Sequence, residues 1–477
     1  MKRSAKRVRG ICWRVLPLFA VAAISAAPAL GQDLNGARVY SEQLRVKLDE
    51  QLPEAREMGF DAGGWFSFAL FSYDDEPSRR DRTLRQYQIR TWASMNLRGV
   101  HRAYVRGLLN WDCWNSGDNP AGGRGDDFDG EIERAWYQFD LGRWLQHRTG
   151  QKPPVGFKFK IGRQFATIGT ALTLSMPLDM IRFDVALRDW QFMAMLGQTI
   201  RDSNNVVDNS SRVAGHQDRC FFGFELVYTG FGQHRPFVYY LDNQDNTRPD
   251  PPDPTQGYEY TSRYVGIGSE GTVLLPDLRY RAEVVGESGK RYSDGIAAGR
   301  DHICAMAVDV MLEYLFRRPT RPKVMVEYLY GSGDSDHVST ATSTVGGNWP
   351  GTRDTNFNAF GFRDTGIAFA PRISNIHIYV LGTSFFPLEH IELFKKMEIG
   401  SKVFFYHKAR ASGPIGDSST DNRGKWLGWE WDIYCNWRVT SDLAWTIRYG
   451  AFQPGSAYDG QGQSCRQYLY TGITLSF

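Results

Sequence analysis

The chain has 477 residues, of which 42% are hydrophobic and 14% aromatic, and its 56 basic and 53 acidic residues leave a net charge of +3. This near-balance gives no sign of nucleic-acid binding. The negative mean hydropathy argues against a protein built from several membrane-spanning helices.

Residues 1–31 are predicted to be a signal peptide that is removed on export. A basic start is followed by the apolar stretch "VLPLFAVAAISAAPAL" and by small residues at Ala29 and Gly31. An N-terminal membrane anchor is the alternative, although the apolar run is short for a span of about 20 residues. Without these 31 residues, 50 basic and 53 acidic residues remain, and the net charge becomes −3.

Residues 32–63 are predicted to form a short N-terminal helical segment in the periplasm. Within 40–58, Leu44, Leu48 and Leu52 share one helical face, although Pro53 interrupts it. From residue 64 to 477 the pattern changes to strands, and no composition shift divides this part. One β domain is therefore expected after the helical segment.

Eighteen strands are predicted from period-two alternation, and several are longer than the five or six residues usual in soluble sheets. A tilted membrane strand needs about 9 to 11 residues. The candidates are 65–73, 84–97, 101–112, 132–141, 155–163, 180–188, 190–200, 219–229, 236–243, 258–269, 278–287, 303–316, 323–331, 373–386, 396–410, 426–438, 442–452 and 466–477.

The connections between these strands alternate in length. Those at 188–189, 230–235, 317–322 and 439–441 are short, whereas those at 115–130, 201–218, 242–257 and 332–371 are long and polar; the turn at 142–154 is the one clear exception. Short turns on one side and long loops on the other are typical of outer-membrane barrels. The fold class predicted is therefore all-β: a single 18-stranded antiparallel transmembrane β-barrel with long extracellular loops, in the bacterial outer membrane.

The faces of the strands agree with a barrel. Leu427, Trp429, Trp431 and Ile433 share one parity and are expected to face lipid, whereas the alternate positions are polar. The last strand, which ends at Phe477, is expected to close the barrel against the first strand and so leave no free edge.

Several segments resemble the alginate-export porin family of bacterial outer membranes. They are "RAWYQFD" (134–140), "FKFKIGRQ" (157–164), "NFNAFGFRD" (356–364), "ISNIHI" (373–378) and "RYGAFQPGSAYDG" (448–460). The resemblance implies an 18-stranded barrel with an arginine-rich pore for a polyuronate. By match to the family, Arg134, Arg163 and Arg448 look like pore arginines, although Arg163 has the parity of its apolar neighbours and reaches the lumen only if its strand bulges or ends there.

Further charged residues occupy the polar parity of the predicted strands, where arginine forks could bind carboxylates and acids could orient them. The alternative is that they form ordinary salt bridges that stiffen the wall. The basic candidates named as pore-lining are Arg102, Arg106, Lys160 and Arg182, and the acidic one is Asp184. Other acids of the same parity are Glu283, Asp309, Glu327, Glu430 and Asp432.

The C-terminal strand also resembles the recognition signal that the barrel-assembly machinery reads. The residues that carry this resemblance are Tyr470, Gly472, Leu475 and Phe477. Outer-membrane lipid and that machinery are therefore expected partners, together with periplasmic polysaccharide-export proteins and an anionic polysaccharide or solute.

No enzyme is predicted, because the histidines are scattered and no nucleophile or metal motif is present. No cofactor is expected, although the acids Asp126, Asp127 and Asp129 could bind Ca²⁺ in a loop. Removal of the signal peptide would leave five of the six cysteines, Cys113, Cys220, Cys304, Cys435 and Cys465. One disulfide could form among these scattered residues, but a disulfide framework is excluded. Three functions remain open: an anion channel that exports an acidic polysaccharide such as alginate, an uptake porin for small solutes, or a surface barrel without transport.

Overall fold

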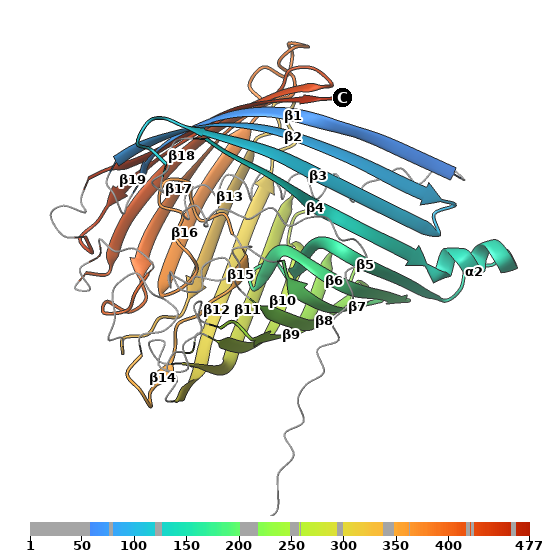
Figure 1. Cartoon of the computed structure of the whole chain (residues 1–477), viewed down its shortest axis with the longest axis horizontal. Coiled ribbons are helices and arrows are strands. Elements are labelled where there is room, and N and C mark those ends of the chain that lie inside the picture. Colours follow the sequence, from blue (N-terminus) through green and yellow to red (C-terminus); the bar gives the residue numbers. More distant parts are fainter. Residues whose placement is uncertain are drawn as a thin grey trace, which may run out of the picture.

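The computed structural model describes residues 58–75, 80–119, 126–200, 218–248, 257, 259–292, 299–336, 348–361, 363–415, 420, 424–458 and 464–477. These residues form a closed antiparallel barrel of eighteen strands with one short helix (Figure 1). The predicted signal peptide and the expected helix at 40–58 lie outside the described residues. No helix in the described part of the chain is long and apolar enough to cross a membrane.

Each wall strand corresponds to one predicted from sequence. The strands are β1 (Met58–Asp75), β2 (Arg80–Leu97), β3 (His101–Trp114), β4 (Asp126–Asp140), β5 (Val155–Ile168), β6 (Leu174–Leu187), β7 (Trp190–Thr199), β8 (Arg219–Tyr228), β9 (His234–Asp245), β10 (Tyr260–Thr272), β11 (Leu278–Tyr292), β12 (Arg300–Leu315), β13 (Lys323–Gly331), β16 (Ile376–Phe385), β17 (Met397–Lys408), β18 (Trp426–Arg438), β19 (Leu443–Pro454) and β20 (Arg466–Ser476).

The last strand closes the barrel against the first, as expected. β20 pairs with β1 from Trp65↔Ser476 to Tyr73↔Tyr468. The backbone N–H groups of Gly64 and Phe477 each donate to the carbonyl of the other at 2.9 Å. Phe477 therefore completes the ladder, and β1 begins at Met58, earlier than the boundary expected at residue 64.

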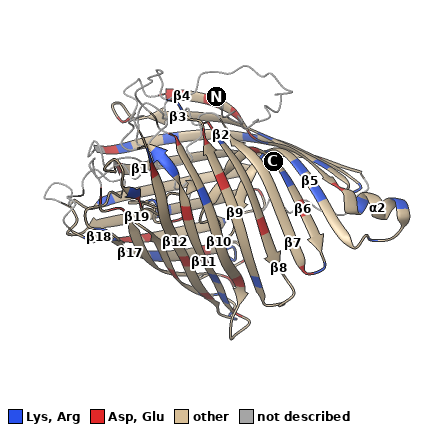
Figure 2. Ribbon diagram, turned by 90° about the horizontal axis from the view of Figure 1, so that it is seen from below, with Lys and Arg blue, Asp and Glu red and all other residues tan. Residues whose placement is uncertain are grey.

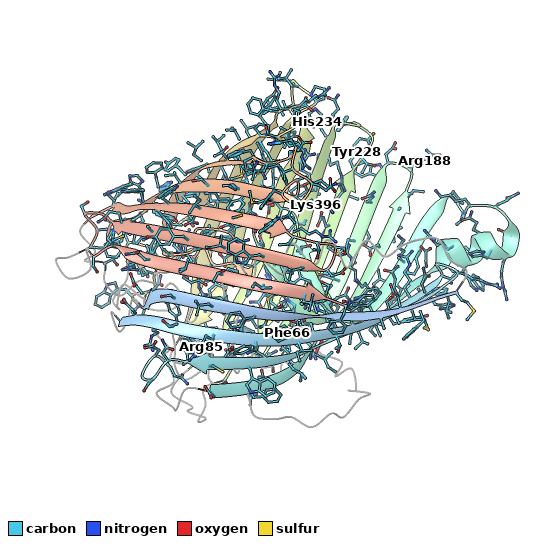
Figure 3. The ribbon with its side chains drawn as sticks, turned by 90° about the horizontal axis from the view of Figure 1, so that it is seen from above. Phe66, Arg85, Arg188, Tyr228, His234 and Lys396 are labelled. Atoms are coloured by element: carbon cyan, nitrogen blue, oxygen red, sulfur yellow. The ribbon has the colours of Figure 1, made fainter. Side chains whose placement is uncertain are left out.

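Because neighbouring strands are antiparallel, their connections fall alternately at two ends of the barrel. We call the end with connections 98–100, 188–189, 229–233, 273–277, 316–322, 386–396 and 439–442 the turn rim, and the opposite end the loop rim. Figure 3 shows Arg188, Tyr228 and His234 of the turn rim along one edge, with Arg85 far from them.

The expected turn at 142–154 contains the helix α2 (Leu141–Thr149), which stands at the turn rim. The Asp140 side chain accepts a hydrogen bond from the Arg143 N–H at 2.9 Å, and Gly150 ends the helix in the left-handed conformation. An N-cap aspartate and a C-terminal glycine are ordinary helix signals. The helix was missed because it is short and its flanks read as strand.

Exposure follows the predicted alternation on most strands. On β18, Trp429 and Trp431 are about two-fifths exposed, whereas Glu430 is fully buried. The expectation that Leu427 faces lipid is wrong, because its side chain is fully buried. The register shifts opposite it, between Tyr406 and His407, and Gly428 has a φ of 129°. This bulge reverses the parity of the residues before it.

Two segments leave the wall at the loop rim and fold into the interior. β5 pairs with β4 only up to Arg163, and β6 pairs with β7 only from Leu178 onward. We call residues 164–177 between these points the inner hairpin. The inner loop is residues 348–361 and 363–375, part of the connection between β13 and β16; it contains the two-residue strands β14 (Arg353–Asp354) and β15 (Phe360–Gly361).

The inner hairpin and inner loop pack on each other and on the wall. β15 pairs with Leu174 and Ser175 of β6, and the rings of Phe221 and Phe360 are 4.9 Å apart. Apolar side chains of both segments are buried in one core with side chains from the wall strands. Residues 165–178 carry no charged side chain because they form a packed interior rather than a charged pore wall.

Candidate functional site

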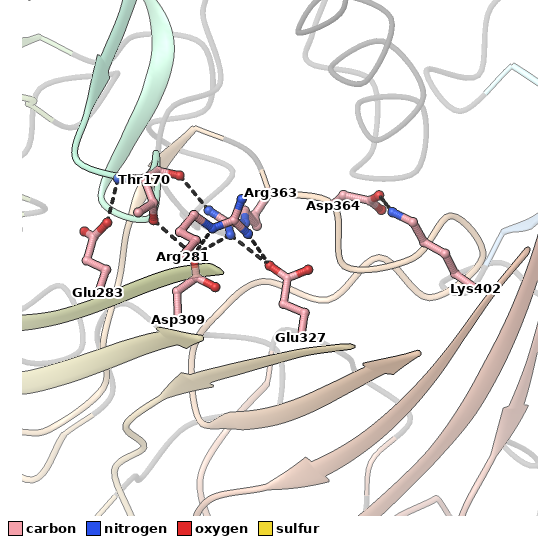
Figure 4. Close-up of polar contacts among 8 residues, drawn as sticks. All are labelled: Thr170, Arg281, Glu283, Asp309, Glu327, Arg363, Asp364 and Lys402. Carbon is pink, nitrogen blue, oxygen red and sulfur yellow. Dashed lines mark hydrogen bonds and ion pairs between the residues drawn. The ribbon is translucent and has the colours of Figure 1, made fainter. Parts of the chain in front are cut away.

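Arg363 of the inner loop joins the two inner segments to the wall. One of its terminal nitrogens, Nη2, donates to Asp309 at 2.6 Å and to Glu327 at 2.9 Å, while Nη1 donates to the carbonyl of Thr170 at 2.8 Å (Figure 4). Arg281 donates to the same two carboxylates at 2.8 and 2.6 Å. Burial lowers the pKa of Arg363, but the neighbouring carboxylates of Asp309 and Glu327 raise it further, so that this pKa lies above its ordinary value.

The tip of the inner hairpin is held by carboxylates of the opposite wall. The Thr170 N–H donates to Glu283 at 2.6 Å, its hydroxyl donates to Asp309 at 3.0 Å, and the Gly169 N–H donates to Glu225 at 3.1 Å. Gly169 has a φ of 56°, and a Cβ there would lie 2.6 Å from the Tyr239 ring. Only glycine fits this approach without displacement.

Another wall carboxylate, Glu430 of β18, binds backbone groups of the inner loop. It accepts the backbone N–H groups of Ile367, Ala368 and Phe369 at 2.6, 2.7 and 2.9 Å. Glu287 of β11 accepts the Asn358 N–H at 3.1 Å on the other side of the loop. Carboxylates that accept several backbone donors make strong, charge-assisted anchors. The inner loop is therefore fixed at both of its sides.

Arg448 lies near the same loop. Lys402 pairs with Asp364, the residue after Arg363 (Figure 4). Burial raises the pKa of the Asp364 carboxyl, but the positive charges of Lys402 and, to a smaller extent, Arg448 hold this pKa below its usual value. The guanidinium of Arg448 also lies 6.0 Å from the centre of the Tyr434 ring. Basic groups of β17 and β19 thus meet the inner loop at this point.

Arg106 and Arg134 lie opposite each other on the inner faces of β3 and β4, and both are buried. The wall bulges here, so that Glu133 also turns inward and pairs with Arg106 at 2.8 Å. Arg134 donates to the carbonyl of Glu133 at 2.8 Å, and its guanidinium lies 5.4 Å from the ring of Phe165 in the inner hairpin.

The remaining named residues of the wall lie closer to the turn rim. Lys160 and Arg182 are directly opposite on β5 and β6, and Arg182 binds Asp184 through two nitrogens at 3.0 and 2.8 Å. Arg102 faces Gln138, the neighbour of Lys160. Bands of both charge signs are visible along the strands in Figure 2.

Arg163 is placed differently from the other named arginines. Its register partner is Ala135, so it has the opposite parity to Arg134. It binds Asp179 through two nitrogens at 2.9 and 3.1 Å and donates to the carbonyl of Ile132 at 2.8 Å. Arg163 therefore lies at the point where the inner hairpin leaves β4, on the opposite parity to Arg134.

Sequence reasoning missed the residue that joins the site together. Arg363 stands in the quoted "NFNAFGFRD" segment, but nothing in a loop sequence shows that it folds inward. Glu283, Asp309, Glu327 and Glu430 were placed on the inward parity, yet their contacts lie far along the chain; Thr170 and Glu283 are 113 residues apart. Among the described residues, no group of three or more histidines, cysteines or acids could hold a metal ion, and Asp126, Asp127 and Asp129 form no such group.

Comparisons with known proteins agree with this architecture. A family model described as alginate export matches residues 175–471, well over half of the chain. Arg448 and Arg363 lie within the matched residues, whereas Arg134 and Arg163 lie before them. A comparison with curated proteins gives no match.

Solved structures from Pseudomonas aeruginosa share the fold. OccK8 (OprE) has a TM-score of 0.54 at 9% identity, over 88% of this chain and 98% of that one. OccK5 (OpdH) has a TM-score of 0.52 at 11% identity, over 87% and 98%. A structure of OpdK with vanillate has a TM-score of 0.52 at 10% identity, over 88% of this chain and all of that one.

Proposed function

Because the chain belongs to the alginate export family, we propose that it is an outer-membrane channel for carboxylated anions, with an acidic polysaccharide such as alginate as its main solute. Membership of an export family also argues for a channel rather than an enzyme. The expected partners are outer-membrane lipid, the barrel-assembly machinery and periplasmic proteins that deliver the polymer.

The observation that carries this proposal is the set of basic groups on the inner wall beside the narrowed interior. Lys402 and Arg448 lie near Asp364 of the inner loop, and Lys160 and Arg182 face each other on β5 and β6. Cations in a narrow pore lower the electrostatic cost of an entering anion, and a guanidinium matches a carboxylate geometrically. Neighbouring acids such as Asp184 keep binding weak enough for release.

Uptake of small carboxylates is the second candidate, and the inner segments favour it. Fixed inner segments leave less room for a polymer than an open barrel would. The fold is shared with a porin whose structure was solved with vanillate, itself a small carboxylate. Both candidates need the same basic wall, and they differ in the size of the solute that passes.

Planar lipid bilayers containing the purified protein test the shared part of this proposal. A potassium chloride gradient should give a reversal potential that indicates anion preference. Arg448→Glu and Lys160→Glu should each shift that potential toward cations, whereas Lys396→Glu, in an exposed turn of the turn rim, should change it little. If Arg448→Glu and Lys160→Glu both left the ion selectivity unchanged, these cations would only stabilise the wall and would not select anions.

The two solute classes are separated by a second measurement. Liposomes containing the protein should release entrapped oligouronates if the channel passes acidic polymers. Release of vanillate alone would instead support uptake of small carboxylates. A barrel that conducts neither ions nor solutes would contradict both.

A further inference from the structure

Three aromatic side chains form a row across the inner faces of β2, β3 and β4. The rings of Trp92 and Tyr104 have centres 6.2 Å apart with an 18° angle, and those of Tyr104 and Trp136 are 5.8 Å apart with a 21° angle. Val105 and Tyr137, the next residues along β3 and β4, are exposed on the outer face. This aromatic row therefore faces the interior.

The two tryptophans at the ends of the aromatic row are partly exposed to the interior of the barrel. Tyr104, between the other two, is only 5% exposed, whereas Trp92 and Trp136 are half-buried. Gly63 pairs with Trp92, and a Cβ on it would lie 3.2 Å from the Trp92 ring, so the glycine leaves space for the indole. Tyr104 and Trp136 are directly opposite and lie within the last turn-rim residues of β3 and β4.

Positive charge flanks the aromatic row on both sides. Toward the turn rim, Arg102, Gln138, Lys160 and Arg182 follow one another in register from β3 to β6. Toward the loop rim lie Arg106 and Arg134, with the carboxylate of Glu133 bound to Arg106. Residues that share one face of a strand are about 6.6 Å apart. Aromatic and basic side chains therefore alternate at a spacing close to the size of one sugar ring.

Lys160 connects the two chemistries directly. Its ammonium lies 4.0 Å from the centre of the Trp136 ring, a favourable cation–π distance. A uronic acid has the matching pair of features: the C–H groups of its ring are apolar, and its carboxylate projects from the ring edge. A neutral sugar lacks the charge, and a small carboxylate such as acetate lacks the ring.

We propose that the aromatic row and its flanking cations form a binding strip for the sugar rings of a uronic-acid polymer. Tyr104 and Lys160 cover the two faces of the Trp136 ring, so the edges of Trp92 and Trp136 contact the C–H groups of sugar rings, while Lys160 and Arg102 pair with the carboxylates. The strip lies near the turn rim, where a polymer arriving from the periplasmic side would first meet the wall. This inference rests on the proposed function and adds the part of the solute, the sugar ring, that the wall recognises.

The test is titration calorimetry of the whole protein, folded in detergent, with oligomers of mannuronic acid as the probe. Trp136→Ala should weaken binding about tenfold, near the lower end of what one aromatic contact contributes, and Trp136→Phe should retain most of the affinity. Tyr137→Ala, on the outer face of the same strand, should leave it unchanged. Heat-dependent mobility in electrophoresis verifies that each variant is folded.

The outcomes separate this inference from the proposed function. Unchanged oligouronate affinity in folded Trp136→Ala would overturn the strip, as would an equal weakening for acetate, because Trp136 would then merely position Lys160. If the original protein bound oligouronates but showed no anion selectivity in the bilayer, the proposed transport would be overturned instead. Binding of neutral malto-oligosaccharides as tightly as oligouronates would also contradict the strip, since its cations would have no role.

Discussion

At the scale of single residues, the interior depends on charged side chains that are buried because they are paired. Arg363 contacts both the inner hairpin and two wall carboxylates, and Arg281 shares those carboxylates. A buried charge that loses its partner is destabilising by a few kcal/mol. Such residues are therefore positioning residues for the inner hairpin and the inner loop.

Arg363→Gln should enlarge the channel. Without the guanidinium, the inner loop loses its link to Thr170, and Asp309 and Glu327 repel each other more strongly. We expect a higher single-channel conductance and a loss of roughly 3–5 kcal/mol in the stability of the inner loop. Bilayer recordings check the first effect, with Arg188→Gln on the turn rim as the control; equal conductance in both variants would remove Arg363 from this role.

We expect Asp354 to make the inner loop sensitive to pH. Burial is the largest cause that raises the pKa of this carboxyl, from 3.8 to about 6, although the neighbouring Arg291 lowers it. Because the folded pKa lies above the unfolded one, the fold favours the protonated form. Stability from this group is fully present below about pH 4 and is lost as the pH rises through about 6.

We expect the protection of amides in residues 348–358 against hydrogen exchange to fall between pH 4 and pH 7, beyond the intrinsic change in exchange rate. Asp354→Asn cannot ionise and should keep its protection over this range. The comparison is made at each pH by mass spectrometry. Identical pH profiles for the two proteins would show that Asp354 does not titrate in this window.

At the scale of elements, the strands and the inner segments are held by different means. Wall strands are held by continuous ladders, as between β11 and β12 from Leu278↔Tyr314 to Tyr292↔Arg300. The inner loop has only two-residue strands and depends on side-chain anchors such as Glu430. A single substitution can therefore release the inner loop without opening the wall.

Glu430→Gln should loosen residues 366–369. A carboxylate accepts all three backbone N–H groups, whereas an amide offers one acceptor oxygen and brings donors of its own. Each buried donor left unsatisfied costs about 1–3 kcal/mol. We expect faster proteolytic cleavage in the inner loop with the barrel intact. Glu392→Gln, in an exposed turn, is the matched control and should be cleaved like the original protein.

At the scale of the whole molecule, closure joins residues from the two described ends of the barrel. Gly64 and Phe477 exchange two hydrogen bonds, and β1 pairs with β20 beyond them. Barrels avoid free edges because an unpaired strand exposes a row of polar backbone groups. In lipid that exposure is more costly than in water.

Deleting Phe477 should lower the amount of folded protein in the outer membrane. The deletion removes the last two hydrogen bonds of the closing ladder and one residue of the expected assembly signal, while leaving the inner segments untouched. The folded fraction is measured by heat-dependent mobility of isolated membranes, and Phe477→Tyr serves as the conservative control. Normal levels of the shortened protein would reduce Phe477 to an ordinary wall residue.

The sequence by itself determined the number and order of the wall strands and the facing of most of their residues, because period-two alternation is a local pattern. It also determined the resemblance to the alginate export family, which the family match confirms. The side-chain direction of Leu427 was predicted wrongly, and that of Arg163 was left open, for one physical reason. At both positions the strand bulges or leaves the wall, beside Gly428 with its φ of 129° and Gly162 with its φ of 120°.

Only the tertiary structure decided what fills the barrel. In sequence, residues 164–177 resemble an apolar strand pair, and residues 348–361 and 363–375 resemble a long polar loop; only the structure shows that these segments fold inward. Their contacts join Thr170 to Glu283 and Arg363 to Thr170, and Arg363 and Thr170 are 193 residues apart. Contacts at such separations leave no local periodicity, because they are fixed by the curvature of the closed wall and by the desolvation of paired charges.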